Sequence, residues 1–322
     1  LLPEPFARWF AARGWSARAH QLDMIAAALD GVDALLIAPT GGGKTLAGFL
    51  PSLIEISSEN RTGKRLHTLY ISPLKALAVD IARNLSAPIA EMDLPVRVET
   101  RTGDTPPARR KRQREDPPDI LILTPEQLAL MISGEGAPLL FSDLRRIIID
   151  EAHALMPGKR GDLLVLALGA LQQWAPRAQR VGLSATVADA DGLARWIAPG
   201  APEGARIVRG VSGTAPRIDV LDSDARIPWA GHMGRHAIEE IYRAIGPAKT
   251  ALLFVNTRAQ AEFVFQTLWS ANDAGYAIAL HHGSLDVAQR RKVEAAMAEG
   301  RLKAVVCTST LDLGIDWGDV DL

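Results

Sequence analysis

Cysteine and long apolar runs are both scarce in this sequence, and each shortage excludes a class of protein. Cys307 is the only cysteine among the 322 residues, so neither a disulfide framework nor a cysteine-based zinc site is available. The longest apolar runs, such as 34–38 and 251–255, are far shorter than the roughly 20 residues of a membrane-spanning helix. We therefore expect a cytoplasmic protein without a membrane span, with Cys307 in a hydrophobic core.

An excess of charge of one sign is also missing. The chain carries 36 Lys and Arg against 37 Asp and Glu, which gives a net charge of −1. Any binding to a phosphate backbone must therefore come from local patches of charge. The length and the 48% hydrophobic content predict a globular chain of two ordinary domains.

Short apolar runs alternate with longer helical patterns, which is typical of an α/β fold with parallel sheets. Proline- and glycine-rich stretches at 199–204 and 210–216 interrupt this alternation. We therefore expect one domain over 1–207 and another over 208–322. The runs predicted as strands are 34–38, 69–72, 120–124, 147–150, 181–184, 218–221, 251–255, 278–281 and 304–307.

Residues 38–45 read Ala-Pro-Thr-Gly-Gly-Gly-Lys-Thr and lie between a predicted strand and a predicted helix, as a phosphate-binding loop requires. Glycines let several backbone N–H groups point at a phosphate, and the helix N-terminus adds partial positive charge. Lys44 is expected to bridge the β- and γ-phosphates, and Thr45 to offer its hydroxyl to Mg²⁺. The usual motif begins with glycine, and Ala38 at that position leaves the cradle intact. The predicted cradle comprises Thr40, Gly41, Gly42, Gly43, Lys44 and Thr45.

A second candidate element is the acidic pair that follows the strand 147–149. Asp150 is expected to hold Mg²⁺ through water, and Glu151 to orient and deprotonate the attacking water. Taken alone, such a pair is more often a solvated cap or turn. About a hundred residues separate it from Lys44, and a parallel sheet can bring both strand ends to the same edge.

Arg18 and Gln21 lie upstream of the loop, where they could hydrogen-bond or stack on adenine. An ordinary polar helix face explains them equally well. The choice of adenine over guanine rests mainly on the resemblance described next, and the absence of an Asn-Lys-x-Asp string for reading guanine agrees with it.

These motifs, followed by Ser184-Ala185-Thr186, resemble those of superfamily 2 DEAD/DEAH-box helicases. The sequence looks closest to the Lhr (large helicase-related) family and its bacterial ligase-associated DEXH-box branch. The resemblance implies two tandem RecA-like (P-loop NTPase) domains, with the second domain cut short. Four strings carry the closer assignment: 124–128, TPEQL; 153–155, HAL, with 159–161, KRG; 254–258, FVNTR; and 308–316, TSTLDLGID.

The resemblance also implies roles for matching residues. Gln21 reads adenine, while Lys44, Asp150 and Glu151 match the catalytic positions. Ser184 and Thr186 match a triplet that couples the nucleotide site to strand movement, and Gly314 and Asp316 match residues that approach ATP from the second domain. The positions that match nucleic-acid contacts are Lys75, Thr102, Gly103, Thr124 and Pro125, then Thr257, Arg258, His282, Gly283, Ser284, Thr308 and Ser309.

None of these contacts is typical of base reading, so we expect sequence-tolerant tracking of a single-stranded backbone. The resemblance implies an ATP-dependent helicase or translocase that moves 3′ to 5′ on DNA and unwinds DNA or RNA:DNA duplexes. It suggests DNA repair or ligase-associated proteins as partners. It also suggests that the chain is a monomer. A non-catalytic clamp is the alternative, and a kinase or GTPase would have no use for the TSTLDLGID and HHGS strings.

Three further expectations concern features outside these motifs. The basic run 109–114 is interpreted as a solvated helix face, and Trp229, Trp269 and Trp317 as packing residues. Superfamily 2 motors complete their ATP site with arginines of a Gln-x-x-Gly-Arg-x-Gly-Arg-like motif, which is absent from these 322 residues. We therefore expect this chain by itself to bind ATP and Mg²⁺ but to hydrolyse ATP poorly.

Overall fold

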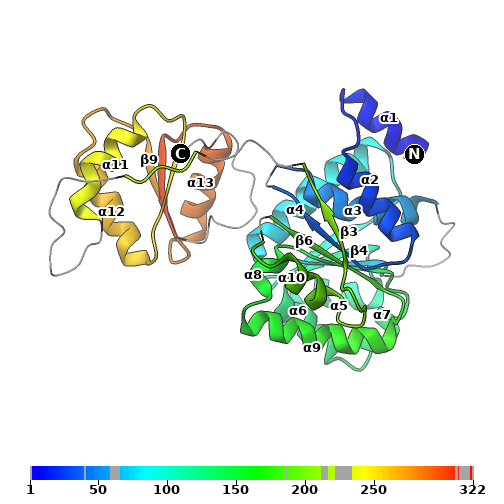
Figure 1. The fold of residues 1–322 in the computed structure, drawn as a ribbon. Helices are drawn as coiled ribbons and strands as arrows, with labels where there is room; N and C mark the ends of the chain where they lie inside the picture. Colours follow the sequence, from blue (N-terminus) through cyan, green and yellow to red (C-terminus); the bar gives the residue numbers. More distant parts are fainter. Residues whose placement is uncertain are drawn as a thin grey trace. The chain divides into compact units, whose positions relative to one another are not determined.

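The computed structural model describes residues 2–39, 41–58, 66–185, 187–211, 217–221, 234–308, 311 and 320. The chain divides into two compact units, 1–214 and 215–322, and the described part of each contains one parallel sheet (Figure 1). The α/β prediction is confirmed. No helix among the described residues is long and apolar enough to cross a membrane.

The sheet of the first unit has seven strands within the described residues, in the spatial order β3-β4-β2-β5-β6-β1-β7. Five of them coincide with predicted apolar runs, and the two edge strands, β3 and β7, were not predicted. Because β7 pairs with β1, the predicted boundary between 207 and 208 falls inside this strand. The strands are β1 (Ala34–Ile37), β2 (Thr68–Ile71), β3 (Val98–Arg101), β4 (Ile120–Leu123), β5 (Arg146–Ile149), β6 (Gln179–Ser184) and β7 (Arg206–Arg209).

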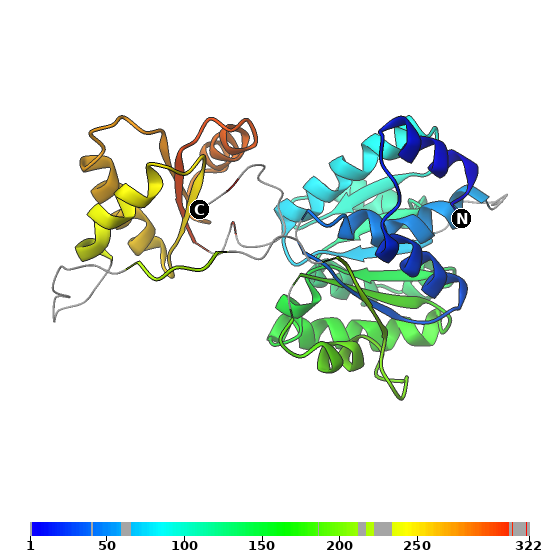
Figure 2. The same ribbon diagram turned by 45° about the horizontal axis from the view of Figure 1, so that its top comes forward.

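Helices cover both faces of this sheet (Figures 1 and 2). Successive strand residues point to opposite faces, so Leu69 and Ile71 join the core beneath α6 and α9, while Tyr70 stacks on Phe49 of α3. Each such burial stabilises the fold by about 1.5–3 kcal/mol. The helices are α1 (Glu4–Ala12), α2 (Ala19–Leu29), α3 (Lys44–Ser58), α4 (Lys75–Glu91), α5 (Pro107–Glu115), α6 (Pro125–Ile132), α7 (Ala137–Phe141), α8 (Ala152–Leu155), α9 (Lys159–Trp174) and α10 (Ala190–Ile197).

The described part of the second unit has a three-stranded parallel sheet in the order β8-β10-β9. One apolar cluster packs α11 and α12 against this sheet, and a second cluster, which includes the buried Cys307, packs α13 against it. The elements are η1 (Arg235–Ala237), α11 (Ile238–Ile245), β8 (Ala251–Phe254), α12 (Arg258–Ser270), β9 (Ile278–His281), α13 (Val287–Ala298) and β10 (Ala304–Cys307).

Two predictions for this unit were wrong. Residues 218–221 were predicted as a strand but form none, because they have no ladder partner among the described residues. Ile218 and Val220 are 85% and 94% exposed, so their alternation does not bury a face. Trp269 was expected to be a packing residue, but its ring contacts Phe265 while more than half of its surface stays exposed. Trp229 and Trp317 lie outside the described residues.

Candidate nucleotide site and nucleic-acid interface

The strand order of the first sheet divides its carboxyl edge into two neighbouring halves. Strands β5, β6 and β1 are adjacent, and they deliver the acidic pair, Ser184 and the glycine-rich loop. Strands β3, β4 and β2 are also adjacent, and they deliver Thr102, Thr124 and Lys75. The sheet therefore places the predicted nucleotide residues beside the predicted nucleic-acid residues of this unit, on one edge.

The glycine-rich loop has a backbone that larger residues would not adopt without strain. Gly41 and Gly43 have φ of 71° and 75°, in the left-handed region that favours glycine. A Cβ on Gly42 would lie 2.7 Å from the carbonyl oxygen of Pro39. The loop is joined to β6 by a hydrogen bond from Ala38 N to the Ser184 carbonyl oxygen, 3.1 Å long. This geometry fits a cradle whose backbone approaches a phosphate closely.

Lys44 begins α3 directly after the cradle. Its side chain is buried, and its Nζ has no hydrogen-bond partner among the described residues. A buried ammonium without a partner is costly, and an anion such as a phosphate group would satisfy it. The free amine, the glycines and the N-terminus of α3 together fit the phosphates of a nucleotide.

Asp150 and Glu151 are both buried at the end of β5. Burial, followed by the negative charge of Glu151, raises the pKa of Asp150 to about 7, although Tyr70 and Lys44 act to lower it. A divalent cation would supply the positive charge that this carboxylate lacks. Among the described residues, no cluster of three or more His, Cys, Asp or Glu forms a metal site. Mg²⁺ is usually held by one or two carboxylates together with substrate phosphates, a set that Asp150 and a bound nucleotide would supply.

Glu151 has a strained backbone, with φ 43° and ψ 47°. Non-glycine residues with such angles cost energy and concentrate at functional sites. The side chain of Glu151 lies 3.5 Å from Nδ1 of His153, and the same Nδ1 lies 2.7 Å from the hydroxyl oxygen of Ser184. His153 therefore links the acidic pair to the end of β6.

We predict that the contact between His153 and Ser184 contributes about 1 kcal/mol of coupling. Replacing either residue by alanine should lower nucleic-acid-stimulated ATP turnover, and the double variant should lose less than the sum of the two losses. A double-mutant cycle on turnover measures this difference. Strictly additive losses would show that the hydrogen bond does not couple His153 to Ser184.

The predicted adenine residues lie against the cradle. Nη1 of Arg18 donates to the Gly41 carbonyl oxygen at 3.3 Å, and Oε1 of Gln21 accepts from the backbone of Arg18 at 2.9 Å. Nε2 of Gln21 lies 3.1 Å from the position of a Cβ on Gly43. His20, which the sequence analysis did not single out, lies between Arg18 and Gln21 in the chain and is buried. Its Nε2 lies 2.9 Å from the Gly42 carbonyl oxygen. Three neighbouring residues of one segment therefore position the loop.

On the neighbouring half of the edge, the loop 102–104 is held by short contacts. Nζ of Lys75 lies 3.1 Å from a carboxylate oxygen of Asp104. The Thr102 hydroxyl accepts from Asp104 N at 3.3 Å, while Thr102 N donates to the Thr105 hydroxyl at 2.9 Å. Gly103 is exposed at the tip. Thr124 is the N-cap residue of α6 and Pro125 its first residue, so this helix presents its N-terminus at the same edge.

The second unit arranges its predicted contacts in the same way, at the carboxyl edge of its own sheet. Thr257 caps α12 by accepting from Gln260 N at 3.1 Å, and Arg258 donates to the Ser284 hydroxyl. Ser284 N donates to Nδ1 of the buried His282 at 3.3 Å. Gly283 lies exposed between His282 and Ser284, and Thr308 follows β10. Five predicted site residues lie outside the described part of the chain: Thr40, Thr186, Ser309, Gly314 and Asp316.

The comparisons with known proteins agree with this geometry. The DEAD/DEAH box helicase family model matches residues 18–192, and the Helicase conserved C-terminal domain model matches residues 235–322. The chain belongs to the DEAD/DEAH box helicase family. Together with the relatives described next, this match confirms the predicted superfamily 2, Lhr-type assignment and the tandem RecA-like fold.

Two relatives show how similar this chain is to Lhr proteins. The Lhr helicase/probable uracil glycosylase of Mycolicibacterium smegmatis is 35% identical over 363 residues, covering 98% of this chain and 24% of the relative. The ATP-dependent helicase Lhr-Core of Methanothermobacter thermautotrophicus is 35% identical over 317 residues, covering 91% of this chain and 36% of the relative. The chain thus spans well under half the length of these relatives.

A solved structure gives the same likeness in three dimensions. Mycobacterium smegmatis helicase Lhr, bound to ssDNA and AMP-PNP, matches with a TM-score of 0.80 and 35% identity. The match covers 99% of this chain and 43% of that chain.

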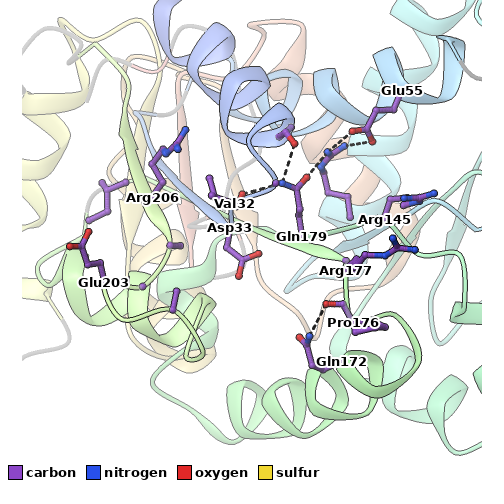
Figure 3. Close-up of a pocket in the computed structure, with 18 residues that line it drawn as sticks. Val32, Asp33, Glu55, Arg145, Gln172, Pro176, Arg177, Gln179, Glu203 and Arg206 are labelled. Atoms are coloured by element: carbon purple, nitrogen blue, oxygen red, sulfur yellow. Dashed lines mark hydrogen bonds and ion pairs between the residues drawn. The ribbon is translucent and has the colours of Figure 1, made fainter.

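A cavity of 1110 Å³ lies far from this helicase site, at the opposite edge of the first sheet, where β5, β6, β1 and β7 begin (Figure 3). It has no glycine-rich cradle. Arg146, only 1% exposed, forms an ion pair with Glu55 in which both oxygens are 3.0 Å from the guanidinium, and it donates to Gln179 at 2.8 Å. Gln179 in turn donates to the carbonyl oxygens of Ala28 and Val32, each at 3.2 Å. The floor of this cavity is a structural polar network.

The charge state of Glu55 follows from its place in this network. Burial acts to raise the pKa of Glu55, but hydrogen bonds from His67 and Arg146 and the charge of Arg146 outweigh it and lower the pKa to about 2. Glu55 is therefore ionised at neutral pH, and it joins α3 to Arg146 of β5 and to His67, which directly precedes β2.

Proposed function

We propose that this chain is the ATP-driven motor of a nucleic-acid helicase or translocase. The observation that carries the proposal is the division of one sheet edge into two adjacent halves. One half holds a glycine cradle, a buried carboxylate pair and a buried lysine whose Nζ has no hydrogen-bond partner in the described part of the chain. The other half holds loops that present hydroxyls, a lysine and a helix N-terminus, which are the groups that bind a phosphate backbone.

In the proposed reaction, the cradle and Lys44 bind the β- and γ-phosphates of ATP and neutralise charge that develops at the transferred group. Glu151 accepts a proton from the attacking water, while Arg18 and Gln21 bind the adenine. Thr45 and Asp150 would hold Mg²⁺, which would supply positive charge that neutralises the phosphates. His153 and Ser184 position the end of β6 relative to the carboxylates.

The finer assignments belong to the same proposal. The chain tracks one DNA strand 3′ to 5′, displaces a DNA or RNA complement, and acts in DNA repair within the ligase-associated branch of the Lhr family. The solved Lhr relative bound to ssDNA and AMP-PNP supports this choice of ligands. The domains of the motor are proposed as 1–207 and 208–322, with the strand β7 continuing the first to residue 209.

A strand-displacement panel on the full-length protein tests these assignments. It compares 3′-tailed, 5′-tailed and blunt duplexes of one sequence, each made as DNA:DNA and as RNA:DNA, with and without ATP. We expect ATP-dependent displacement from the 3′-tailed duplexes alone. Displacement from the 5′-tailed set would reverse the polarity, and ATP turnover without displacement from any duplex would identify a translocase.

A further inference from the structure

Two charged side chains of β3 lie buried beneath α5, and only one of them has a counter-charge among the residues that the structure describes. Glu99 and Arg101 are two residues apart and therefore point to the same face of the sheet. They are 8% and 4% exposed. Charged side chains are almost never buried so deeply unless they are paired.

Glu99 is fully paired, and its partners come from the basic run 109–114. Arg112 approaches both of its oxygens at 2.7 Å, Gln113 donates at 3.0 Å and Arg109 at 3.2 Å. The prediction that this run is a solvated helix face is confirmed for Arg109, Lys111, Arg112 and Arg114, which are exposed, and it was wrong for Gln113, which is buried against Glu99.

Arg101 has no such partner. Its Nη1 donates to the backbone carbonyl oxygen of Arg110 at 3.2 Å, and its Nε is enclosed without an acceptor in the part of the chain that the structure describes. Burial, and then the positive charges of Arg114 and Arg110, lower the pKa of Arg101 to about 10. A buried guanidinium beside two other cations requires an anion that these residues do not supply.

The site lies directly behind the loop 102–104. Nη2 of Arg110 donates to the carbonyl oxygen of Gly103 at 2.6 Å and to that of Thr102 at 3.3 Å. Lys75 lies on this loop as well, with Nζ 2.9 Å from the position of a Cβ on Gly103. Two cations, Arg110 and Lys75, therefore lie around an exposed glycine, together with the carboxylate of Asp104, at the edge where the nucleic-acid strand is proposed to pass.

We infer that Arg101 and Arg110 form a binding site for a backbone phosphate of the bound strand, and that Arg114 extends this site along α5. This inference rests on the proposed function, since it assigns a further part of the same nucleic-acid path. The missing counter-ion is then a phosphodiester, to which the guanidinium groups donate charge-assisted hydrogen bonds.

The test replaces Arg101 with methionine, an apolar side chain of similar length, in the full-length protein. Single-stranded DNA affinity is measured over a range of salt, and thermal unfolding is measured without DNA. We expect roughly 10-fold weaker binding and a salt slope smaller by about 0.7, the contribution of one single-strand phosphate. The melting temperature should be unchanged or higher, because an uncompensated buried cation has been removed.

Arg97→Met is the matched control. Arg97 lies just before the same strand, and it is paired with Asp116 at 2.9 Å and with two backbone carbonyl oxygens. This variant should lower the melting temperature and keep the salt slope. If Arg101→Met behaves in that way instead, Arg101 is a structural residue and the inference is overturned.

Two further outcomes separate the possible failures. If the wild-type protein shows no salt-dependent binding to DNA, the proposed function itself fails. With the nucleotide site saturated by an ATP analogue, inorganic pyrophosphate is added to both proteins. If it raises the melting temperature of the wild type but not of Arg101→Met, while both bind DNA equally, the site takes a free phosphate and the inference fails alone.

Discussion

Glu151→Gln is expected to lower the ATP turnover number by about 10²- to 10⁴-fold, while nucleotide affinity stays close to that of the wild type. The amide keeps the size of the side chain but removes its basicity. Glu151 is buried, has a strained backbone and lies next to Asp150, the proposed Mg²⁺ ligand. Turnover is measured on the full-length protein with saturating single-stranded DNA, and affinity by equilibrium binding of an ATP analogue.

The same substitution at Glu299 is the control for this result. Glu299 is exposed and pairs only with the nearby Arg301, so Glu299→Gln should leave turnover within about twofold of the wild type. Equal turnover in wild type and Glu151→Gln would contradict the assignment of Glu151 as the general base. It would favour the alternative of a non-catalytic clamp that uses the fold only to bind nucleic acid.

Arg146→Ala is expected to destabilise the first unit by about 1–3 kcal/mol. The substitution removes the guanidinium partner of the half-exposed Glu55, which keeps its contact with His67, and it leaves the amide oxygen of Gln179 without its donor. Arg145→Ala is the matched control, because Arg145 is exposed and its side chain forms no hydrogen bond or ion pair with another described residue. That variant should change stability by no more than about 0.5 kcal/mol.

Urea unfolding followed by circular dichroism distinguishes the two variants, and its pH dependence tests the same network. In the unfolded chain Glu55 takes up a proton near its usual pKa of 4.5, whereas in the folded chain the pKa is about 2. The stabilisation is therefore complete above pH 4.5 and is lost as the pH falls towards 2. Glu55→Gln should be less stable than wild type at pH 7 and should show a flatter profile in this window. Parallel pH profiles for wild type and Glu55→Gln would contradict the network. Equal losses of stability in Arg145→Ala and Arg146→Ala would also contradict it.

The central strands of the first sheet could be predicted because the local apolar pattern and the packing of the whole sheet favour the same structure there. Strand β1 is a continuous apolar run, and β5 is one after its first residue, Arg146. Such runs are typical of strands buried on both faces, and the glycine-rich loop and the acidic pair follow them directly. Parallel strands then bring Lys44 and Asp150 to one edge. The order of the strands, with β6 between β1 and β5, is set by packing and is not visible in any single motif.

The edge elements could not be predicted in the same way. Strands β3 and β7 read Val-Glu-Thr-Arg and Arg-Ile-Val-Arg, and edge strands carry charges that hide the apolar pattern. Residues 218–221 show the reverse error, since an apolar run becomes a strand only where a ladder partner exists. The burial of His20, Tyr70 and Arg101 depends on contacts with distant segments, so their roles emerge only from the structure.

Equilibrium binding of ATP with Mg²⁺ to wild type and to Lys44→Ala tests the central claim most directly, namely that the cradle at this sheet edge is the nucleotide site. Lys44 is buried, and its Nζ has no partner among the described residues, so it is available to the phosphates. We predict that Lys44→Ala binds ATP about 10- to 100-fold more weakly, whereas Lys292→Ala, at an exposed lysine of α13, binds as wild type does. Unchanged ATP affinity in Lys44→Ala would place the nucleotide elsewhere and contradict the account.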